Sequence, residues 1–266
     1  MKDFLKHILK RNNLISDKTF IQVECNPERQ LPWMREIEPV DASEKYGSYW
    51  EARYLNRINT NVEICDQFQS HSKIWARELE YGWISRRTLS SDLLLDVGSG
   101  VSDFPAILSL ITNNVVAVDI TDYGEEHTVI AKKFQTSYKW MLADARKLDY
   151  SDNTFDCVTC ISVLEHIADG GDISAMQEML RVCKVGGRVI ISVPYSHSKT
   201  LEDFQHPSGL QKYYTFQDVI NLTTASSVHI RDFNFAICGM PEDNKQIKFG
   251  HPEESSVLLI CFEKAA

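Results

Sequence analysis

Leu93-Leu94-Leu95-Asp96-Val97-Gly98-Ser99-Gly100 is the stretch of the sequence that decides the fold. Its continuous apolar run suits a parallel strand that is buried on both faces. The two glycines suit a turn in which bare backbone N–H groups approach a ligand, and residues 102–112 are predicted to form the helix that follows. A turn of this kind at the carboxyl end of a first strand is where open α/β sheets bind nucleotide-like molecules. We therefore expect a nucleoside-cofactor loop here.

The residues around the glycines distinguish between two kinds of nucleoside cofactor. The dinucleotide-binding pattern spaces three glycines as G-x-G-x-x-G, and Asp103 stands at the third position here. Asp96 lies two residues before the first glycine, where a carboxylate would repel a diphosphate and attract an ammonium or sulfonium group. Asp96, Gly98 and Gly100 resemble the D/E-x-G-x-G motif of the class I S-adenosylmethionine-dependent methyltransferases, which implies that all three bind the cofactor. A plain strand–turn–helix is the alternative on these residues alone.

Composition limits the class of partner. The chain has 266 residues, a formal net charge of −9 and a pI of about 5.4. Binding to a phosphate backbone depends on Lys and Arg, so we expect no nucleic-acid partner. No apolar run approaches the ~20 residues that cross a bilayer. The first segment interleaves Lys and Arg with apolar residues, unlike a secretory signal, so a cytoplasmic location is expected.

The 7 cysteines form no paired framework. Cys157 and Cys160 make the only CxxC sequence, and they fall in a predicted strand, where residues three apart point to opposite faces. We expect buried free thiols, as in a reducing cytoplasm, and no metal site.

Residues 1–69 are expected to form a helical and irregular extension ahead of a domain at residues 70–266. Residues 1–11 place apolar side chains on one helical face and Lys on another, and such a helix can lie on a membrane. Because it is only about three turns long, we expect it to pack on the body or on a second copy in a homodimer, without stable membrane insertion. Residues 72–89 are predicted to form a helix on the sheet, since Trp75, Leu79 and Trp83 recur at i, i+4 and i+8.

The Tyr-Trp-Glu-x-Arg-Tyr sequence at residues 49–54 resembles the lid ahead of the sheet in many small-molecule methyltransferases. The resemblance implies that Tyr49 covers the cofactor, that Trp50 contacts the acceptor and that Arg53 pairs with the carboxylate of the cofactor's methionine part. A planar guanidinium has an advantage over Lys in such a pair, and an aromatic ring can face a sulfonium. For each residue the alternative is an aromatic helix face packed on the domain.

Further acids follow the next two predicted strands. Residues 115–119 end in Asp119, about 20 residues past the glycine turn, where a carboxylate can bind both ribose hydroxyls. NAD enzymes share this feature. Asp119, with Ile120 beside it, therefore indicates that the ligand contains a ribose, and it does not indicate which reaction the protein catalyses. After a predicted helix at 123–134 and strand at 138–142, Asp144 and Ala145 resemble the start of the family's G-D-A … L-P-F-x-D-x-S-F-D pattern. The resemblance implies that the Asp144 carboxylate and the Ala145 N–H bind adenine, and an acid that caps a turn is the alternative.

The fourth predicted strand, 157–161, runs into Ser162-Val163-Leu164-Glu165-His166. V-L-E-H after F-D-x-V resembles the ubiquinone-biosynthesis-like branch of the family. These residues should line the floor between cofactor and acceptor, with Ser162 toward the cofactor and Glu165 toward the acceptor. His166 is a candidate general base, because imidazole titrates near working pH. A hydrogen-bonded structural histidine is the alternative.

The rest of the chain completes the predicted sheet. After a helix at 173–183, residues 180–188 resemble the family's L-R-x-L-K-P-G-G-x turn, with Val185 in the place of proline. A fifth strand at 188–193 is predicted to stop at Pro194, and another helix and two strands, 228–235 and 256–262, end the chain. Residues 195–214 are predicted to form a long loop, and loops of this length are usually functional. This loop carries the candidate acceptor contacts Tyr195, Tyr213 and Tyr214 and the candidate bases His197 and His206.

Together these features predict an α/β fold with a Rossmann-like seven-stranded, mostly parallel sheet, an antiparallel C-terminal strand pair and a helical N-terminal lid. The resemblance implies in-line transfer of a methyl group from S-adenosyl-L-methionine to a small-molecule acceptor, such as a sugar or natural-product hydroxyl. S-adenosyl-L-homocysteine would be the product, and no metal is needed. Two other classes stay open: a non-catalytic S-adenosylmethionine-binding sensor or partner subunit, and a NAD-dependent oxidoreductase or epimerase, which Asp103 disfavours.

Overall fold

The computed structural model describes residues 76–196, 201–203, 211–223, 227–237 and 256–266. Residues 1–69, with the predicted lid contacts Tyr49, Trp50 and Arg53, lie outside these ranges, as do the candidate bases His197 and His206. Within the described ranges, no helix is both long enough and apolar enough to span a bilayer.

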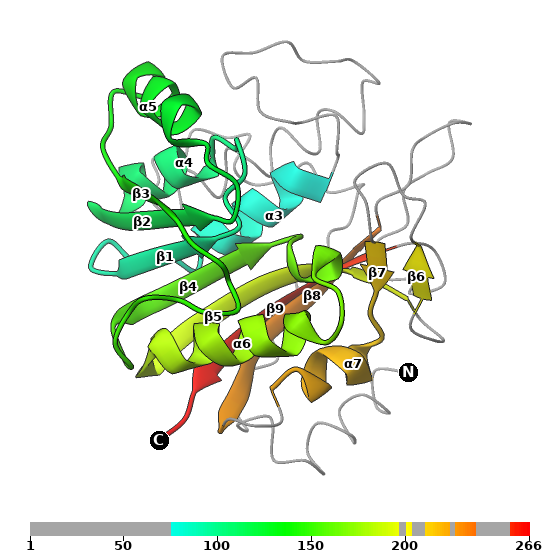
Figure 1. The fold of residues 1–266 in the computed structure, drawn as a ribbon. Coiled ribbons are helices and arrows are strands. Elements are labelled where there is room, and N and C mark those ends of the chain that lie inside the picture. Colours follow the sequence, from blue (N-terminus) through cyan, green and yellow to red (C-terminus); the bar gives the residue numbers. More distant parts are fainter. Residues whose placement is uncertain (1–75, 197–200, 204–210, 224–226, 238–255) are drawn as a thin grey trace, which may run out of the picture.

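Seven strands of the described residues form one sheet in the order β3-β2-β1-β4-β5-β9-β8 (Figure 1). Strands β1 to β5 pair in parallel, whereas β9 runs antiparallel to both β5 and β8. The predicted α/β sheet with its antiparallel C-terminal strand pair is therefore confirmed, whereas the predicted N-terminal lid lies outside the described residues. The strands are β1 Leu93–Val97, β2 Asn114–Asp119, β3 Lys139–Leu142, β4 Phe155–Ile161, β5 Cys183–Tyr195, β8 Val228–Ile237 and β9 Ser256–Lys264.

Helices cover both faces of the sheet (Figure 1). Helices α3 and α4 pack on one face of the sheet, and α6 and α7 pack on the other. The buried side chains form two clusters accordingly, one that includes residues of α3 and α4 and one that includes residues of α6 and α7. Burial on both faces is the reason that β1, β2 and β5 are near-continuous apolar runs. The helices are α3 Ala76–Ser85, α4 Phe104–Ile111, α5 Gly124–Lys133, α6 Gly171–Val182 and α7 Phe216–Asn221, with a short 3-10 helix, η2, at Leu164–His166.

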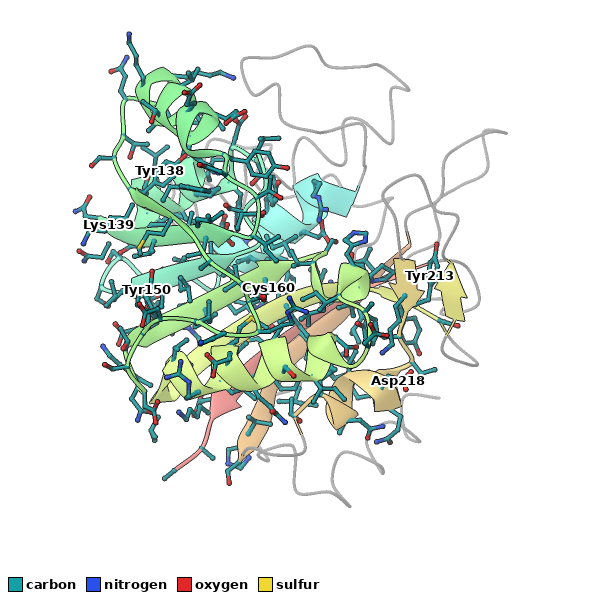
Figure 2. The ribbon with its side chains drawn as sticks, in the orientation of Figure 1. Tyr138, Lys139, Tyr150, Cys160, Tyr213 and Asp218 are labelled. Carbon is teal, nitrogen blue, oxygen red and sulfur yellow. The ribbon has the colours of Figure 1, made fainter. Side chains whose placement is uncertain are left out.

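The two cysteines of the CxxC sequence confirm the alternation within β4. Cys157 packs in the cluster with α3 and α4, and Cys160 packs in the cluster with α6 and α7, where Figure 2 labels it within the sheet. Both thiols are buried and free, as are those of Cys183 and Cys261. Burial raises the pKa of Cys157 and of Cys160 well above the usual range, so these thiols stay protonated.

The fifth strand differs from its prediction. β5 begins at Cys183, ahead of the glycine turn, and it continues past Pro194 instead of stopping there. β4 ends opposite Ser192, so the N–H that proline lacks would have had no partner on β4. Pro194 can therefore stay in register with Val257 of β9.

The predicted loop at 195–214 also contains strands. β6 Leu201–Asp203 and β7 Gln211–Tyr213 pair as a short antiparallel sheet. Directly after β7, the Tyr214 N–H donates to the Pro194 carbonyl at 2.9 Å, which attaches this segment to the end of β5. The alternation of polar and aromatic residues in so short a pair gave no sequence signal for a strand.

Candidate functional site

A cavity of about 700 Å³ lies at the carboxyl ends of β1, β2 and β4. The order of the sheet reverses at β1, because β2 and β3 follow on one side and β4 and β5 follow on the other. The loops diverge at such a point and leave the crevice in which open α/β sheets bind ligands. The predicted site residues that line the cavity are Asp96, Gly98, Gly100, Asp119, Ile120, Asp144, Ala145, Ser162 and His166.

The turn after β1 requires glycine for two different reasons. Gly98 has a φ of +75° and Gly100 a φ of +52°, a region that favours glycine. A Cβ on Gly98 would lie 2.3 Å from Cγ2 of Val163, so the turn packs directly against the end of β4. A Cβ on Gly100 would meet no atom of the described residues within 4 Å. Gly100 therefore presents its backbone to open space beside the cavity.

Asp119, at the end of β2, is held by two backbone donors. Its Oδ2 accepts the Gly100 N–H at 2.8 Å, and its Oδ1 accepts the Thr121 N–H at 2.9 Å. These bonds fix the orientation of the carboxylate, and each oxygen keeps a lone pair for a further donor. The exposed Ile120 side chain beside it adds an apolar wall to the cavity. This geometry fits a ligand that donates two adjacent hydroxyls.

Asp96, at the tip of β1, is a buried carboxyl. It is 3% exposed, and its Oδ1 accepts the hydroxyl of Thr159 on β4 at 2.6 Å. Burial raises the pKa of Asp96 to about 7, against the opposing hydrogen bond from Thr159, and the charge of Asp119 adds to the rise. A cationic group beside Asp96 would favour the ionised form, whereas a diphosphate would add to the repulsion. The site therefore fits a ligand that carries an ammonium group.

The sequence analysis missed an ion pair on α3 that lies against the same cavity. Arg77 lines the cavity and donates to Oε2 of Glu80 at 2.9 Å. Glu80 is fully buried, and its Oε1 accepts the hydroxyls of Ser162 at 3.0 Å and Ser192 at 2.7 Å. The sequence offered one sign of this pair, because Glu80 lies three residues before Trp83 and so falls on the helix face that was predicted to be buried. A helix predicted only to pack on the sheet therefore also supplies a guanidinium to the site.

Asp144, after β3, is already paired with a neighbour. Nη2 of Arg146 lies 2.6 Å from Oδ2, and both Nε and the backbone N–H of Arg146 donate to Oδ1 at 2.9 Å. These hydrogen bonds from Arg146 hold the pKa of Asp144 below its usual value. Arg146 also lines the cavity and was not singled out in the sequence. An adenine amine at Asp144, which remains a prediction, would have to share the carboxylate with this guanidinium.

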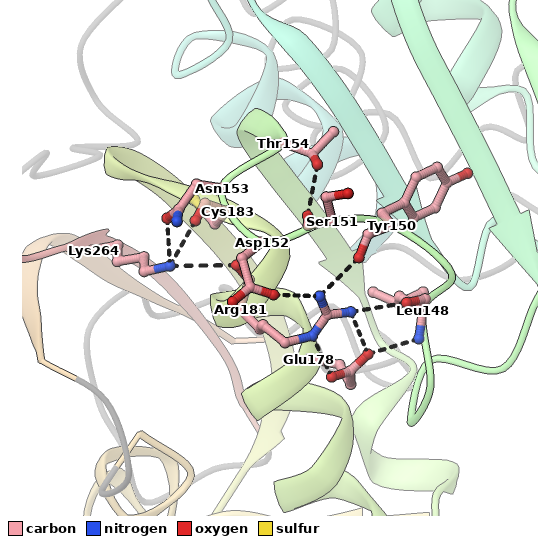
Figure 3. Close-up of polar contacts among 10 residues, drawn as sticks. All are labelled: Leu148, Tyr150, Ser151, Asp152, Asn153, Thr154, Glu178, Arg181, Cys183 and Lys264. Atoms are coloured by element: carbon pink, nitrogen blue, oxygen red, sulfur yellow. Dashed lines mark hydrogen bonds and ion pairs between the residues drawn. The ribbon is translucent and has the colours of Figure 1, made fainter.

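Arg181, in the segment 180–188, contacts the other family-like segment, residues 148–156. Figure 3 shows its guanidinium between the 148–154 loop and α6. It donates to the carbonyls of Leu148 at 2.8 Å and Tyr150 at 2.7 Å, and to the carboxylates of Asp152 and Glu178 at 2.7 Å. The arginine of the L-R-V-C-K segment therefore holds in place the loop that follows Asp144 and Ala145.

The segment after β4 carries two neighbouring ionisable residues, with Nε2 of His166 4.0 Å from Oε1 of Glu165. η2 turns His166 toward the cavity, with its side chain 34% exposed. Glu165, one residue earlier, is 1% exposed and is not among the residues that line the described cavity, so its predicted contact with the acceptor stays a prediction. Burial raises the pKa of Glu165 to about 8, so this carboxyl keeps its proton at neutral pH. Ser162, with a φ of +49°, lines the cavity as predicted.

The three tyrosines predicted to contact an acceptor lie away from the cavity. Tyr214 is fully buried, and its hydroxyl lies 3.0 Å from both the Leu164 carbonyl and Oδ2 of Asp172. Tyr195 is also buried. Tyr213 lies on β7, on the opposite side of the molecule from Tyr138 in Figure 2. None of the three is among the residues that line the described cavity. The backbone bridge between Tyr214 and Tyr195, at the end of β5, accompanies the burial of the Tyr214 side chain in the core.

Comparisons with known proteins agree with this arrangement. A family model described as a methyltransferase domain matches residues 95–191. A ubiquinone/menaquinone biosynthesis C-methyltransferase of Pseudomonas putida is 34% identical over 109 residues, which are 38% of this chain and 41% of that protein. An uncharacterized protein of Methanocaldococcus jannaschii is 32% identical over 180 residues, which are 65% of this chain and 74% of that protein.

A solved structure shares the fold. The 1,6-didemethyltoxoflavin-N1-methyltransferase of Burkholderia thailandensis, with its substrate and S-adenosylhomocysteine bound, has a TM-score of 0.56 at 16% identity. The match covers 86% of this chain and 93% of that one.

The fold and the cavity define a doubly wound α/β protein with a crevice at the switch point of its sheet, the place where proteins of this architecture bind nucleotide-like ligands. The chain belongs to the class I S-adenosylmethionine-dependent methyltransferases, an enzyme family whose cofactor is S-adenosylmethionine. The chain spans only 41% of the length of the curated C-methyltransferases that it matches.

Proposed function

We propose that this protein transfers the methyl group of S-adenosylmethionine to a small-molecule acceptor. The observation that carries the proposal is the set of three carboxylates, Asp96, Asp119 and Asp144, that line one cavity at the ends of neighbouring strands. When bound, S-adenosylmethionine supplies a methyl group that its positive sulfur has already activated. The protein then has to orient the reactants, which can lower a barrier by roughly 7–11 kcal/mol.

Four groups of the cofactor would each find a suitable partner among the residues of the described cavity. Asp119 would accept the ribose hydroxyls, and Asp144 with Ala145 would bind the adenine. Asp96 would hold the ammonium group of the methionine part. Arg77 would bind its carboxylate, because a guanidinium that lines the cavity is suited to that group. Asp96 would instead place a buried acid beside the phosphate of a dinucleotide.

The acceptor is proposed from charge and from the position of His166. A net charge of −9 supports a small molecule rather than a nucleic acid. His166 is the histidine that lines the described cavity, and its side chain is 34% exposed. It would remove the proton from an acceptor hydroxyl.

The proposal is tested by titrating the protein with S-adenosylhomocysteine and with NAD in a calorimeter, followed by a methylation assay with a panel of hydroxylated acceptors. We expect binding of the homocysteine product, no binding of NAD and turnover of at least one acceptor. Binding of NAD alone would overturn the proposal.

A non-catalytic cofactor-binding protein is the second candidate. The burial of Tyr195, Tyr214 and Glu165 favours it, since three predicted acceptor contacts are taken up by the core. Tight binding of S-adenosylhomocysteine without turnover of any acceptor would support this candidate over the enzyme.

A further inference from the structure

His127 occupies an unusual position on α5. In this helix, all of whose residues are described, it is the one buried side chain, at 2% exposed. Its Nε2 lies 2.7 Å from the Gly100 carbonyl oxygen, and its Nδ1 lies 2.8 Å from the Tyr138 hydroxyl. The ring also stacks on Trp140 at a centroid distance of 5.8 Å. His127 is not among the residues that line the cavity, so it stands behind the glycine turn rather than in front of it.

The partners of the ring determine its tautomer. A carbonyl oxygen only accepts, so Nε2 must carry the hydrogen that it donates to Gly100. Nδ1 then accepts from the Tyr138 hydroxyl, which also lies 3.3 Å from the backbone carbonyl oxygen of His127. The Ser99 hydroxyl is a more distant neighbour of Nε2, at 3.4 Å. Burial lowers the pKa of His127 and raises that of Tyr138, so both groups stay neutral and keep these roles.

The residue that His127 holds is the one that orients the ribose-binding acid. The Gly100 carbonyl accepts from His127, and the Gly100 N–H donates to Oδ2 of Asp119 at 2.8 Å. Gly100 is therefore fixed from both sides, in a conformation with a φ of +52° that glycine can leave easily. One continuous chain of hydrogen bonds runs from Tyr138 through His127 and Gly100 to Asp119.

We propose that His127 is a positioning residue for the ribose of S-adenosylmethionine. It holds the Gly100 backbone so that the Gly100 N–H stays on the Asp119 carboxylate. Both ring nitrogens are used in this chain of contacts, so His127 acts through Gly100 and does not touch the cofactor. The inference rests on the proposed function, because it assigns a role within the same cofactor site.

Two amide variants test the proposal at matched polarity. The side-chain nitrogen of Gln falls near the position of Nε2 and can donate to the Gly100 carbonyl, whereas that of Asn is too short to reach it. We expect His127→Gln to bind S-adenosylhomocysteine within about threefold of the wild type and His127→Asn to bind roughly tenfold more weakly, the loss that one hydrogen bond produces. The rate at saturating S-adenosylmethionine should stay the same in both, while its KM rises in His127→Asn alone.

A residue that only fills the core would give a different result. In that case the affinities of the two variants would be equal, or they would follow the unfolding temperatures measured without ligand, and the proposal would be overturned. The ring itself gives an independent reading, because ¹⁵N NMR distinguishes the two neutral tautomers of histidine. A hydrogen on Nε2 supports the proposal, and a hydrogen on Nδ1 overturns it. A wild-type protein that does not bind S-adenosylhomocysteine at all would overturn the proposed function instead, and this inference with it.

Discussion

Replacing Asp96 with Asn should make the ligand-free protein more stable at alkaline pH while weakening cofactor binding. The carboxyl is 3% exposed, and burial raises its pKa from an ordinary value of 3.8 to about 7. The native state therefore keeps a proton on Asp96 between about pH 4 and pH 7, where the unfolded chain has lost it. Rising pH in this window favours the unfolded chain, since the native state binds more protons. Asn has no proton to lose, so its variant escapes this effect.

The magnitude follows from the size of the shift. About three pKa units correspond to about 4 kcal/mol between the acid and alkaline limits, at about 1.4 kcal/mol per unit. Between pH 5 and pH 8 we expect the stability of Asp96→Asn relative to the wild type to increase by about 2–3 kcal/mol. The shape of the site should tolerate the change, because Oδ1 of Asn can still accept the Thr159 hydroxyl.

Urea unfolding followed by tryptophan fluorescence at pH 5 and pH 8, without ligand, measures this difference. Other titrating groups are common to both proteins and cancel in the comparison. Asp149→Asn removes a carboxyl from an exposed position and serves as the matched control. A stability difference between Asp96→Asn and the wild type that is the same at both pH values would refute the reasoning. Calorimetry should show at least tenfold weaker binding of S-adenosylhomocysteine to Asp96→Asn, because the charge that faces the ammonium group is gone.

Three further changes test other parts of the site. Asp119→Ala should weaken S-adenosylhomocysteine binding by about tenfold or more in calorimetry, since the ribose hydroxyls lose their acceptor, and an unchanged affinity would remove the ribose assignment. His166→Ala should slow turnover by roughly 10²-fold or more with cofactor binding kept, and full activity would make this histidine a structural residue. Gly98→Ala should lower the free energy of unfolding by about 1–3 kcal/mol, because the new Cβ would lie 2.3 Å from Val163 at a φ of +75°; a urea midpoint equal to that of the wild type would contradict this packing.

The sheet was predictable because its strands are buried on both faces. Largely apolar runs leave little choice of structure, so β2 and β4 lie within two residues of their predicted bounds. The gathering of three acids at one cavity was predictable for the same reason, since the tips of parallel strands meet at one edge. Asp96, Asp119 and Asp144 all line the cavity as expected.

What the sequence did not reveal depends on contacts between distant segments. Glu80 is buried only because Ser162 and Ser192 arrive from β4 and β5 to donate to it. Tyr214 is buried only because its backbone bonds to the end of β5. Local spacing reports which face a residue occupies within its own element, and it does not report what another element brings to that face. The predicted acceptor contacts Tyr195, Tyr214 and Glu165 were affected most, because other elements of the fold bury them.

The charges around the cavity are incomplete without a cation, and this is the physical basis for the choice of cofactor. Glu80 and Glu165 are buried near Arg77, and Asp96 is buried within range of the same guanidinium. A core selected for stability alone would replace such acids with apolar side chains, because buried carboxylates are unfavourable unless they are paired. Burial instead raises the pKa of both Asp96 and Glu165 to neutral values, so the ligand-free site holds protons where it lacks cations. A ligand with an ammonium group can supply positive charge at Asp96, whereas a dinucleotide would place negative phosphate beside the same buried carboxyl.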